Sequence, residues 1–295
     1  MKYAYYPGCS LSSTGVEYDI STKKVAESLG IELWEIPEWN CCGASSAHLT
    51  DHLLALALPA RNLAIAEEKG LDVAIPCAAC YARCKATEVE VKDSKEMQKT
   101  ISEVIERQYT GKAQARALLD VFVNDLGLQS ISTLVNKPLK DLKVVSYYGC
   151  LLVRPPRLGF DDAEDPQSMD KLIEALGGTP VDWAFKTECC GAAHATTKSE
   201  VGFPMIEKIL TAAKEAGADC IATACPLCMS NLDMRQTQVG AKYGKNYSLP
   251  VFYFTELMGI ALGLNPEELG ISKHFVDALG IVKKLNEAAG RRDTA

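Results

Sequence analysis

The sequence lacks the features that would direct a chain into or across a membrane. Its 295 residues contain no run of about 18 apolar residues, the length that a membrane-spanning helix needs. The first residues, MKYAYYPGCS, have no apolar core of a signal peptide. Basic residues are not in excess, because 31 Lys and Arg stand against 38 Asp and Glu. We therefore expect a cytoplasmic protein with no membrane span and no nucleic-acid partner.

The sequence also lacks its own source of reducing equivalents. The GxGxxG motif of dinucleotide-binding folds is absent, and no ferredoxin-type run of closely spaced cysteines occurs. If the chain takes part in redox chemistry, its electrons must therefore come from another protein.

Cysteine, by contrast, is abundant. The chain has 12 cysteines, at positions 9, 41, 42, 77, 80, 84, 150, 189, 190, 220, 225 and 228. A secreted chain could join them in disulfides, but a chain of this length with 47% hydrophobic residues can build a core without such staples. In a reducing cytoplasm, so many thiols indicate metal binding or redox chemistry.

Ten of the cysteines form a five-cysteine pattern that occurs twice. The first copy consists of Cys9, Cys41, Cys42, Cys77 and Cys80. The second copy consists of Cys150, Cys189, Cys190, Cys225 and Cys228. In both copies an adjacent pair precedes a glycine, and 33 residues separate this glycine from a C-x-x-C pair. The gap before the adjacent pair is 31 residues in the first copy and 38 in the second.

The residues around these cysteines repeat as well. Three pairs of segments match: YAYYPGC at 3–9 with VSYYGC at 145–150, CCGASSAH at 41–48 with CCGAAHA at 189–195, and DVAIPCAAC at 72–80 with CIATACPLC at 220–228. We interpret the chain as a duplicated unit. A Pro- and Asp-rich loop at 154–166 accounts for the longer gap of the second copy.

Strand-like and helix-like segments alternate in the same order in both halves. The expected strands cover 2–6, 32–36, 72–75, 143–148, 180–183 and 219–223. The expected helices cover 18–29, 51–69, 168–176 and 202–216. This alternation predicts an α/β fold with parallel sheets. Because the carboxyl ends of parallel strands lie along one edge of a sheet, cysteines that follow separate strands can converge there.

The whole chain divides into four expected segments. These are a first unit at 1–84, a helical insert at 85–140, a second unit at 141–264 and a helical tail at 265–295. The apolar spacing of the insert predicts helices at 94–109 and 112–127, which could act as a packing bridge or carry a docking face for a partner. The last five residues, 291–295, are expected to fray.

The number of thiols in each copy bears on the metal. A structural zinc site takes four ligands in a tetrahedron, whereas each copy offers five cysteines, two of them adjacent. An ordinary cubane cluster also takes four cysteines. A fifth indicates either a distorted cluster or one thiol kept for redox chemistry. The count favours iron–sulfur over zinc but leaves the type of cluster open.

This pattern resembles the cysteine-rich CCG domain, and two copies behind an N-terminal YYPGC resemble the B subunit of heterodisulfide reductase. The resemblance covers nearly the whole chain. It implies two pseudo-repeated Rossmann-like domains, each holding a noncubane [4Fe-4S] cluster through its five cysteines. The first cluster would use Cys9, Cys41, Cys42, Cys77 and Cys80. The second would use Cys150, Cys189, Cys190, Cys225 and Cys228.

Two clusters that face one disulfide could each transfer one electron to it. Reducing a disulfide requires two electrons, and each cluster can supply one. The candidate proton donors are His194, four residues after Cys190, and His48, six residues after Cys42. Five cations near the cysteines could anchor an anionic substrate: Arg83, Lys85, Arg154, Arg157 and Lys198.

The remaining cysteines and the tyrosines beside the first cysteine of each half are expected to be structural. Cys220 reads as a buried strand residue, and Cys84 as a packed helix residue one turn beyond Cys80. Tyr5, Tyr6, Tyr147 and Tyr148 occupy alternating strand positions, so half of them should face the core.

The resemblance also implies partners and a substrate. A ferredoxin-like iron–sulfur subunit would donate the electrons, and a flavin-containing subunit would feed that donor. The substrate would be the coenzyme M–coenzyme B heterodisulfide, or an analogous small or protein disulfide. Two alternatives remain open: an electron-relay subunit of another CCG-domain oxidoreductase, and a zinc-stabilised binding module without catalysis.

Overall fold

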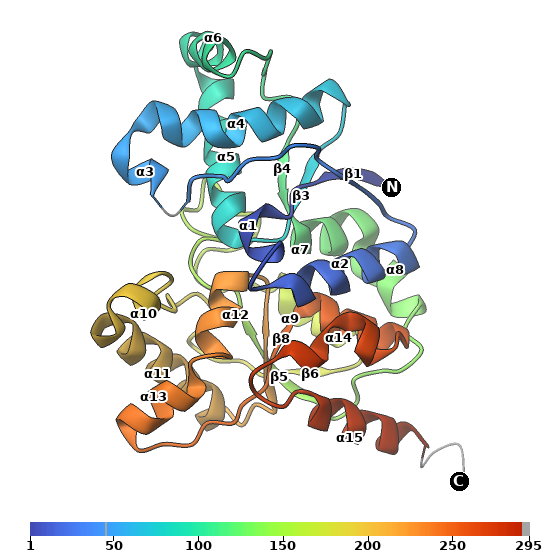
Figure 1. The fold of residues 1–295 in the computed structure, drawn as a ribbon. Coiled ribbons are helices and arrows are strands. Elements are labelled where there is room, and N and C mark those ends of the chain that lie inside the picture. Colours follow the sequence, from blue (N-terminus) through green and yellow to red (C-terminus); the bar gives the residue numbers. More distant parts are fainter. Residues whose placement is uncertain (45, 291–295) are drawn as a thin grey trace.

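Two four-stranded parallel sheets form the centre of the molecule. We analysed a computed structural model that describes residues 1–44 and 46–290. The first sheet has the order β2-β1-β3-β4, with β1 (Lys2–Tyr5), β2 (Glu32–Glu35), β3 (Val73–Ile75) and β4 (Ala115–Ala117). The second has the order β6-β5-β7-β8, with β5 (Lys143–Tyr147), β6 (Thr179–Pro180), β7 (Cys220–Thr223) and β8 (Val251–Tyr253). The predicted α/β class with two pseudo-repeated parallel sheets is confirmed (Figure 1).

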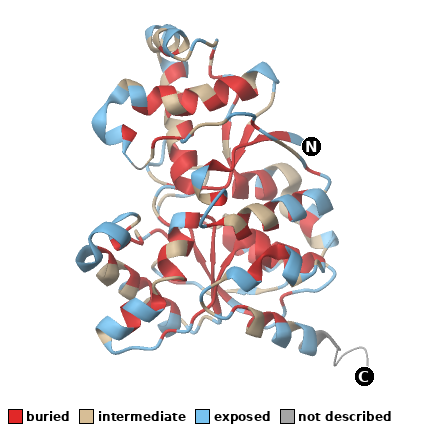
Figure 2. Ribbon diagram, in the orientation of Figure 1, coloured by how far each residue is buried: buried red, intermediate tan, exposed pale blue. Residues whose placement is uncertain are grey.

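Helices connect the strands and cover both sheets. In the first half these are α1 (Gly8–Leu11), α2 (Val16–Ser28), α3 (Ala47–Thr50), α4 (His52–Glu68) and α5 (Ala78–Asp93). In the second half they are α9 (Ser168–Ala175), α10 (His194–Thr197), α11 (Ser199–Glu215), α12 (Pro226–Leu232) and α13 (Gln236–Tyr243). Because helices cover the sheets, the inner strands are buried along most of their length (Figure 2).

The predicted helix at 112–127 is wrong at its start, because residues 115–117 form β4 instead. The sequence Ala-Arg-Ala has good helix propensity, but its backbone pairs in parallel with β3 at Ala74 and Arg116. The buried Glu88 carboxylate also accepts the Ala115 N–H at 2.7 Å. Tertiary pairing therefore overrides local preference. The insert therefore supplies β4, the fourth strand of the first sheet. The strand β8 occupies the corresponding position in the second sheet.

Helices make up much of the rest of the insert. It contains α6 (Lys95–Val104), which confirms the core of the helix predicted at 94–109. After β4 the chain continues through α7 (Leu118–Asp120), a π-helical segment η1 (Val121–Gly127) and α8 (Leu128–Thr133).

The two halves exchange their last helices. Helix α14 (Phe254–Leu262), which follows β8, packs against α2 of the first half, whereas α8 packs against α9 of the second half (Figure 1). A buried hydrogen bond of 2.7 Å joins Ser21 on α2 to Thr255 on α14. The backbone N–H groups of Asn136 and Lys137 both donate to the carbonyl oxygen of Ala261. This exchange fixes the position of one sheet relative to the other.

The predicted helical tail contains two short 3-10 helices, η2 (Pro266–Leu269) and η3 (Ile271–Lys273), followed by α15 (Leu279–Gly290). The fraying predicted for 291–295 falls outside the described residues. Among the helices that the structure describes, none is long and apolar enough to cross a membrane.

Candidate functional site

The ten repeated cysteines all follow the carboxyl ends of strands. The first cysteine of each half lies just after the central strand, β1 or β5, and the adjacent pair follows the neighbouring strand, β2 or β6. Each C-x-x-C pair begins a helix, since Cys77 is the N-cap of α5 and Cys225 is the N-cap of α12. The topology thus brings three separated segments together at one sheet edge in each half.

In the first half the five thiols form a connected group. Cys42 and Cys80 lie with their Sγ atoms 3.2 Å apart. Cys9 interacts with Cys41, and Cys77 interacts with Cys80. Cys9 and Cys41 are exposed to solvent, whereas the other three thiols are buried. The group therefore reaches from the interior to the surface.

The second half repeats this arrangement. The Sγ atoms of Cys190 and Cys228 are 3.7 Å apart. Cys150 interacts with Cys189, and Cys225 interacts with Cys228. Cys150 and Cys189 are partly exposed, and the remaining thiols are buried.

The two thiol groups meet at the contact between the halves. The thiols of Cys77 and Cys225, which belong to different halves, lie close enough for each to shift the pKa of the other. Beside this junction the fully buried rings of Tyr18 and Tyr253 stack, with centroids 4.0 Å apart and planes 10° from parallel. One aromatic ring comes from each half. The ten thiols therefore form two adjoining groups rather than two distant ones.

Glycine allows the backbone to approach the thiols closely. Gly8 has φ of +67°, and a Cβ there would lie 3.1 Å from the Cys80 Sγ. Gly149 has φ of +66°, and a Cβ there would lie 3.0 Å from the Cys228 Sγ. Both positions favour glycine for two reasons, the left-handed backbone and the absence of space.

Two buried tyrosines hold the segments that carry the adjacent cysteines. The Tyr6 hydroxyl donates to the carbonyl oxygen of Asn40 at 2.8 Å, and the Tyr147 hydroxyl donates to that of Glu188 at 2.6 Å. Each acceptor immediately precedes a Cys-Cys pair. The structural role expected for the tyrosines is therefore observed, but all four are buried rather than half of them, because helices cover both faces of a parallel sheet.

Contacts between paired thiols favour the thiolate form, which metals bind, at one thiol of the pair and disfavour it at the other, because they raise the pKa values of Cys80 and Cys150. Hydrogen bonding to Cys80 lowers the pKa of Cys42 to about 7, against the effect of burial, with help from the Ala44 N–H. Hydrogen bonding to Cys150 lowers the pKa of Cys189 to about 6, again against burial. The Gly191 N–H and the charge of His194 contribute to this lowering.

The donor set fits a thiolate-ligated group larger than one ion. Each half offers five thiols, more than a tetrahedral zinc ion takes, together with backbone N–H donors and a close backbone approach. Within the part of the chain that the structure describes, no three His, Cys, Asp or Glu side chains are arranged around a single-ion site.

The four histidines differ in their surroundings. His194 is exposed at the start of α10, and its charge acts on Cys189. His48 is exposed on α3, beyond the other Cys-Cys-Gly segment. His52 lies 2.7 Å from Glu90 at the surface, and the buried His274 pairs with a carboxylate on α14. Of the four, His194 is the one that the structure relates to a thiol of the repeat.

Three of the five predicted substrate-anchoring cations are paired within the protein. Lys85 pairs with Glu88 at 3.0 Å, Arg154 binds Glu164 and Thr187, and Arg157 lies 3.9 Å from Asp93. With respect to the described residues, the side chains of Arg83 and Lys198 form no hydrogen bond or ion pair. The two remaining cysteines, Cys84 and Cys220, are buried as expected.

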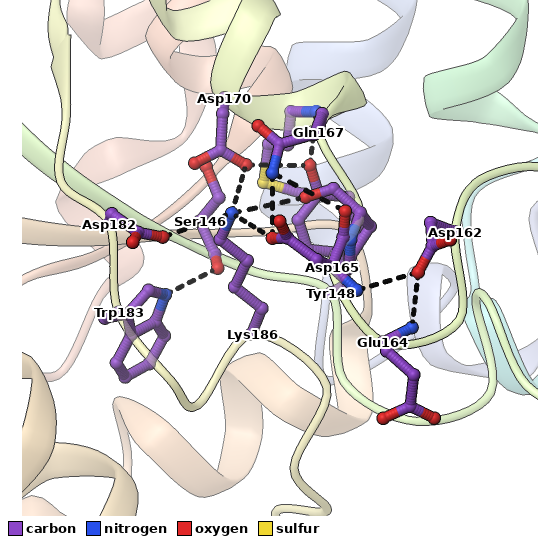
Figure 3. Close-up of polar contacts among 12 residues, drawn as sticks. Ser146, Tyr148, Asp162, Glu164, Asp165, Gln167, Asp170, Asp182, Trp183 and Lys186 are labelled. Carbon is purple, nitrogen blue, oxygen red and sulfur yellow. Dashed lines mark hydrogen bonds and ion pairs between the residues drawn. The ribbon is translucent and has the colours of Figure 1, made fainter.

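A buried lysine beside the second thiol group could not be recognised from the sequence. The Lys186 ammonium lies 2.8 Å from Asp165, 3.6 Å from Asp182 and 3.7 Å from Asp170, as Figure 3 shows. The Tyr148 hydroxyl donates to Asp170 at 3.0 Å. Burial alone would lower the pKa of Lys186, but these carboxylates hold it above its usual value.

This network positions the first cysteine of the second half. The carbonyl oxygen of Lys186 accepts the N–H groups of Tyr148 and Gly149, at 2.9 and 3.1 Å. Cys150 follows directly. The side chain of Lys186 anchors the loop at 161–170, while its backbone fixes the turn that leads to Cys150. In the sequence, Lys186 has the neighbours of an ordinary surface lysine. No motif therefore indicates that it anchors the turn before Cys150.

Comparisons with known proteins agree with the repeat. The cysteine-rich domain model named CCG matches residues 3–85 and 144–233. The chain is 31% identical over 99% of both chains to the B subunit of the ferredoxin/F420H2-dependent CoB-CoM heterodisulfide reductase of Methanosarcina acetivorans. It is 33% identical, over 94% of this chain and 98% of the relative, to the membrane anchor subunit of the 8-methylmenaquinol:fumarate reductase of Wolinella succinogenes.

The fold also has a solved counterpart. A hypothetical protein from Helicobacter pylori superimposes with a TM-score of 0.76 over 94% of this chain and 52% of that chain. At 13% sequence identity, this similarity shows a shared fold.

Proposed function

The chain belongs to the family of heterodisulfide reductase B subunits, proteins with two cysteine-rich CCG domains, and we propose that it reduces a disulfide to two thiols at two iron–sulfur clusters. As an oxidoreductase-family subunit it works within a larger complex. The catalytic role, the substrate and the two clusters are the content of the proposal.

Each thiol group would hold one [4Fe-4S] cluster of the noncubane type. The first would be bound by Cys9, Cys41, Cys42, Cys77 and Cys80. The second would be bound by Cys150, Cys189, Cys190, Cys225 and Cys228. The proposal is supported by the convergence of both sets of thiols.

The observation that carries the proposal is the contact between Cys77 and Cys225. Converting one disulfide and two protons into two thiols consumes two electrons, and each cluster, when bound, would supply one. Two redox groups that adjoin can serve a single S–S bond, whereas two distant groups could not. The exposed Cys9 and Cys41 and the partly exposed Cys150 and Cys189 leave an approach from solvent.

His194 is the proposed proton donor. Its imidazole is exposed, so it can exchange protons with solvent, and its charge acts on Cys189. An imidazole changes its charge near neutral pH, which suits the protonation of a product thiolate.

The proposed setting is the cytoplasm, in a complex with a ferredoxin-like iron–sulfur subunit and a flavin-containing subunit. The substrate would be the coenzyme M–coenzyme B heterodisulfide or an analogous small or protein disulfide. Relatives whose names state a CoB-CoM heterodisulfide reductase support this choice.

A second candidate function is an iron–sulfur relay that passes electrons without reducing a disulfide. The observation that favours it is the 33% identity to a membrane anchor subunit of a fumarate reductase. A chain that holds both clusters but reduces no disulfide, and exchanges electrons with a redox partner, would establish this alternative.

The test compares serine variants of buried site cysteines with a buried cysteine outside the site. Cys42→Ser and Cys190→Ser each remove one proposed ligand, so we expect both to abolish disulfide reduction by an artificial one-electron donor. Cys220→Ala changes a buried thiol of β7 and should retain activity. Undiminished turnover in both serine variants would refute the proposal.

A further inference from the structure

The two thiol groups are not equivalent, and one of the differences is an amide side chain that contacts the second group. We infer that Asn231 is a positioning residue that holds the Cys190 segment and raises the reduction potential of the second cluster, through a side-chain hydrogen bond that no described residue provides at the first site. This inference rests on the proposed function, because it concerns the cluster that Cys190 would bind.

Asn231 lies on α12, one turn beyond the C-x-x-C pair, and is only 3% exposed. Its Nδ2 atom lies 3.0 Å from the carbonyl oxygen of Cys190, 3.0 Å from that of Ala192 and 3.4 Å from the Cys190 Sγ. One amide group therefore binds both the backbone and the sulfur of this segment.

The backbone that Asn231 holds is strained. Ala192 has φ of +41°, in the left-handed region that a residue with a Cβ rarely adopts. Such a conformation persists where surrounding contacts enforce it. The hydrogen bond from Asn231 to the Ala192 carbonyl oxygen is one such contact, and it keeps the adjoining Cys190 in place.

Among the residues that the structure describes, the first half offers no matching side-chain donor to Cys42. Asn231 follows Cys228 by three residues, and Arg83 follows Cys80 by three residues on the equivalent helix α5. The side chain of Arg83 makes no hydrogen bond to any described residue. Both buried thiols, Cys42 and Cys190, receive a backbone N–H from the second residue after them. The side-chain amide is thus the added contact at the second site.

A hydrogen bond to a ligand sulfur stabilises negative charge on it. Because a cluster gains negative charge when it is reduced, such donors favour the reduced form and raise the reduction potential. Removing the donor should therefore move the second cluster to a more negative potential and leave the first cluster where it is.

The experiment is a potentiometric titration of the cluster-loaded full chain, followed by electron paramagnetic resonance. Asn231→Leu keeps the volume of the side chain without a donor, and Asn231→Asp keeps its shape with an acceptor in place of the amide. We expect one of the two midpoint potentials to become more negative in Asn231→Leu, and further so in Asn231→Asp. Arg83→Gln changes the matching position of the first half. It should leave unchanged the midpoint potential that Asn231→Leu shifts.

Two variants guard against a purely structural effect. If Asn231→Leu loses iron from one half alone, as judged by a halved iron content, the holding role is supported. Asn231→Ser, which retains a donor, should then restore that iron. Loss of iron from both halves in Asn231→Ser would overturn the inference, because Asn231 would then act on the whole fold.

The remaining outcomes separate this inference from the proposed function. Unchanged midpoints in both Asn231→Leu and Asn231→Asp, with full iron content, overturn the inference and leave the proposed function intact. A parallel shift of both midpoints overturns it as well. A wild-type chain without iron refutes both, since no cluster would then exist for Asn231 to influence.

Discussion

The close approach of Gly149 to Cys228 gives a sharp test of the site. In Gly149→Ala the new Cβ would lie 3.0 Å from the Cys228 Sγ. The left-handed φ of +66° adds a backbone cost of about 1–2 kcal/mol. We expect a loss of about 1–2 kcal/mol in the free energy of unfolding from the backbone alone, and a displaced Cys228 in addition.

Gly70 provides a matched control. It has the same φ of +66°, but nothing lies within 4 Å of a Cβ built there. Gly70→Ala should therefore lose about the same 1–2 kcal/mol from the backbone and keep all of its iron. The assay is urea denaturation together with iron analysis of both variants. If Gly149→Ala retains as much iron as Gly70→Ala, the contact with Cys228 does not matter for the site, and the reasoning is refuted.

Two further predictions concern buried charges. Lys186→Met leaves Asp170 buried without its cation, so the free energy of unfolding should fall by about 3 kcal/mol in urea denaturation. The control is Lys171→Met, which changes an exposed lysine of α9. Equal losses in the two variants would contradict the role of Lys186. Burial opposes the charging of His274, but the attraction of Glu256 prevails and raises the pKa of His274, and burial likewise raises the pKa of Glu256. Both shifts mean that the folded state binds more protons than the unfolded state, so stability must fall as pH rises. The stability that His274 contributes is complete below a pH of about 6.5 and is lost as pH rises through its higher folded pKa. The difference in the free energy of unfolding between wild type and His274→Asn should therefore shrink when denaturation is measured from pH 6 to about pH 9. A difference that stays constant over this range would contradict the role of His274.

The cysteine pattern predicted the main features of the site because it depends on topology. Because the alternating strands and helices predicted parallel sheets, the cysteines after the strand ends were expected to lie along one edge. The burial of Cys84 and Cys220 also followed from their positions in a helix and a strand. Whether the ten converging thiols bind clusters stays a prediction.

Other features depend on contacts between distant residues, which no local pattern reveals. The segment at 115–117 has helix-forming residues, but its pairing with β3 and the bond to Glu88 make it a strand. The role of Lys186 depends on carboxylates 4 to 21 residues away. Asn231 reaches Cys190 across 41 residues. From the sequence alone, Lys186 and Asn231 are indistinguishable from ordinary surface or helix residues.

The pairing of the two halves was also beyond the sequence. The exchange of α14 and α8 between the halves brings Tyr18 against Tyr253 and Cys77 against Cys225. A repeat shows that two similar units exist, but it does not show which surfaces they share.

The most direct test of the central claim is the metal content of the anaerobically purified full chain, with the electron paramagnetic resonance spectrum of its oxidised form. Two [4Fe-4S] clusters predict about eight irons and about eight acid-labile sulfides per chain, with a signal that a thiol substrate perturbs. About four irons with one zinc would leave one redox half and contradict the two-cluster account. Two zinc ions and no iron would contradict the oxidoreductase proposal as a whole.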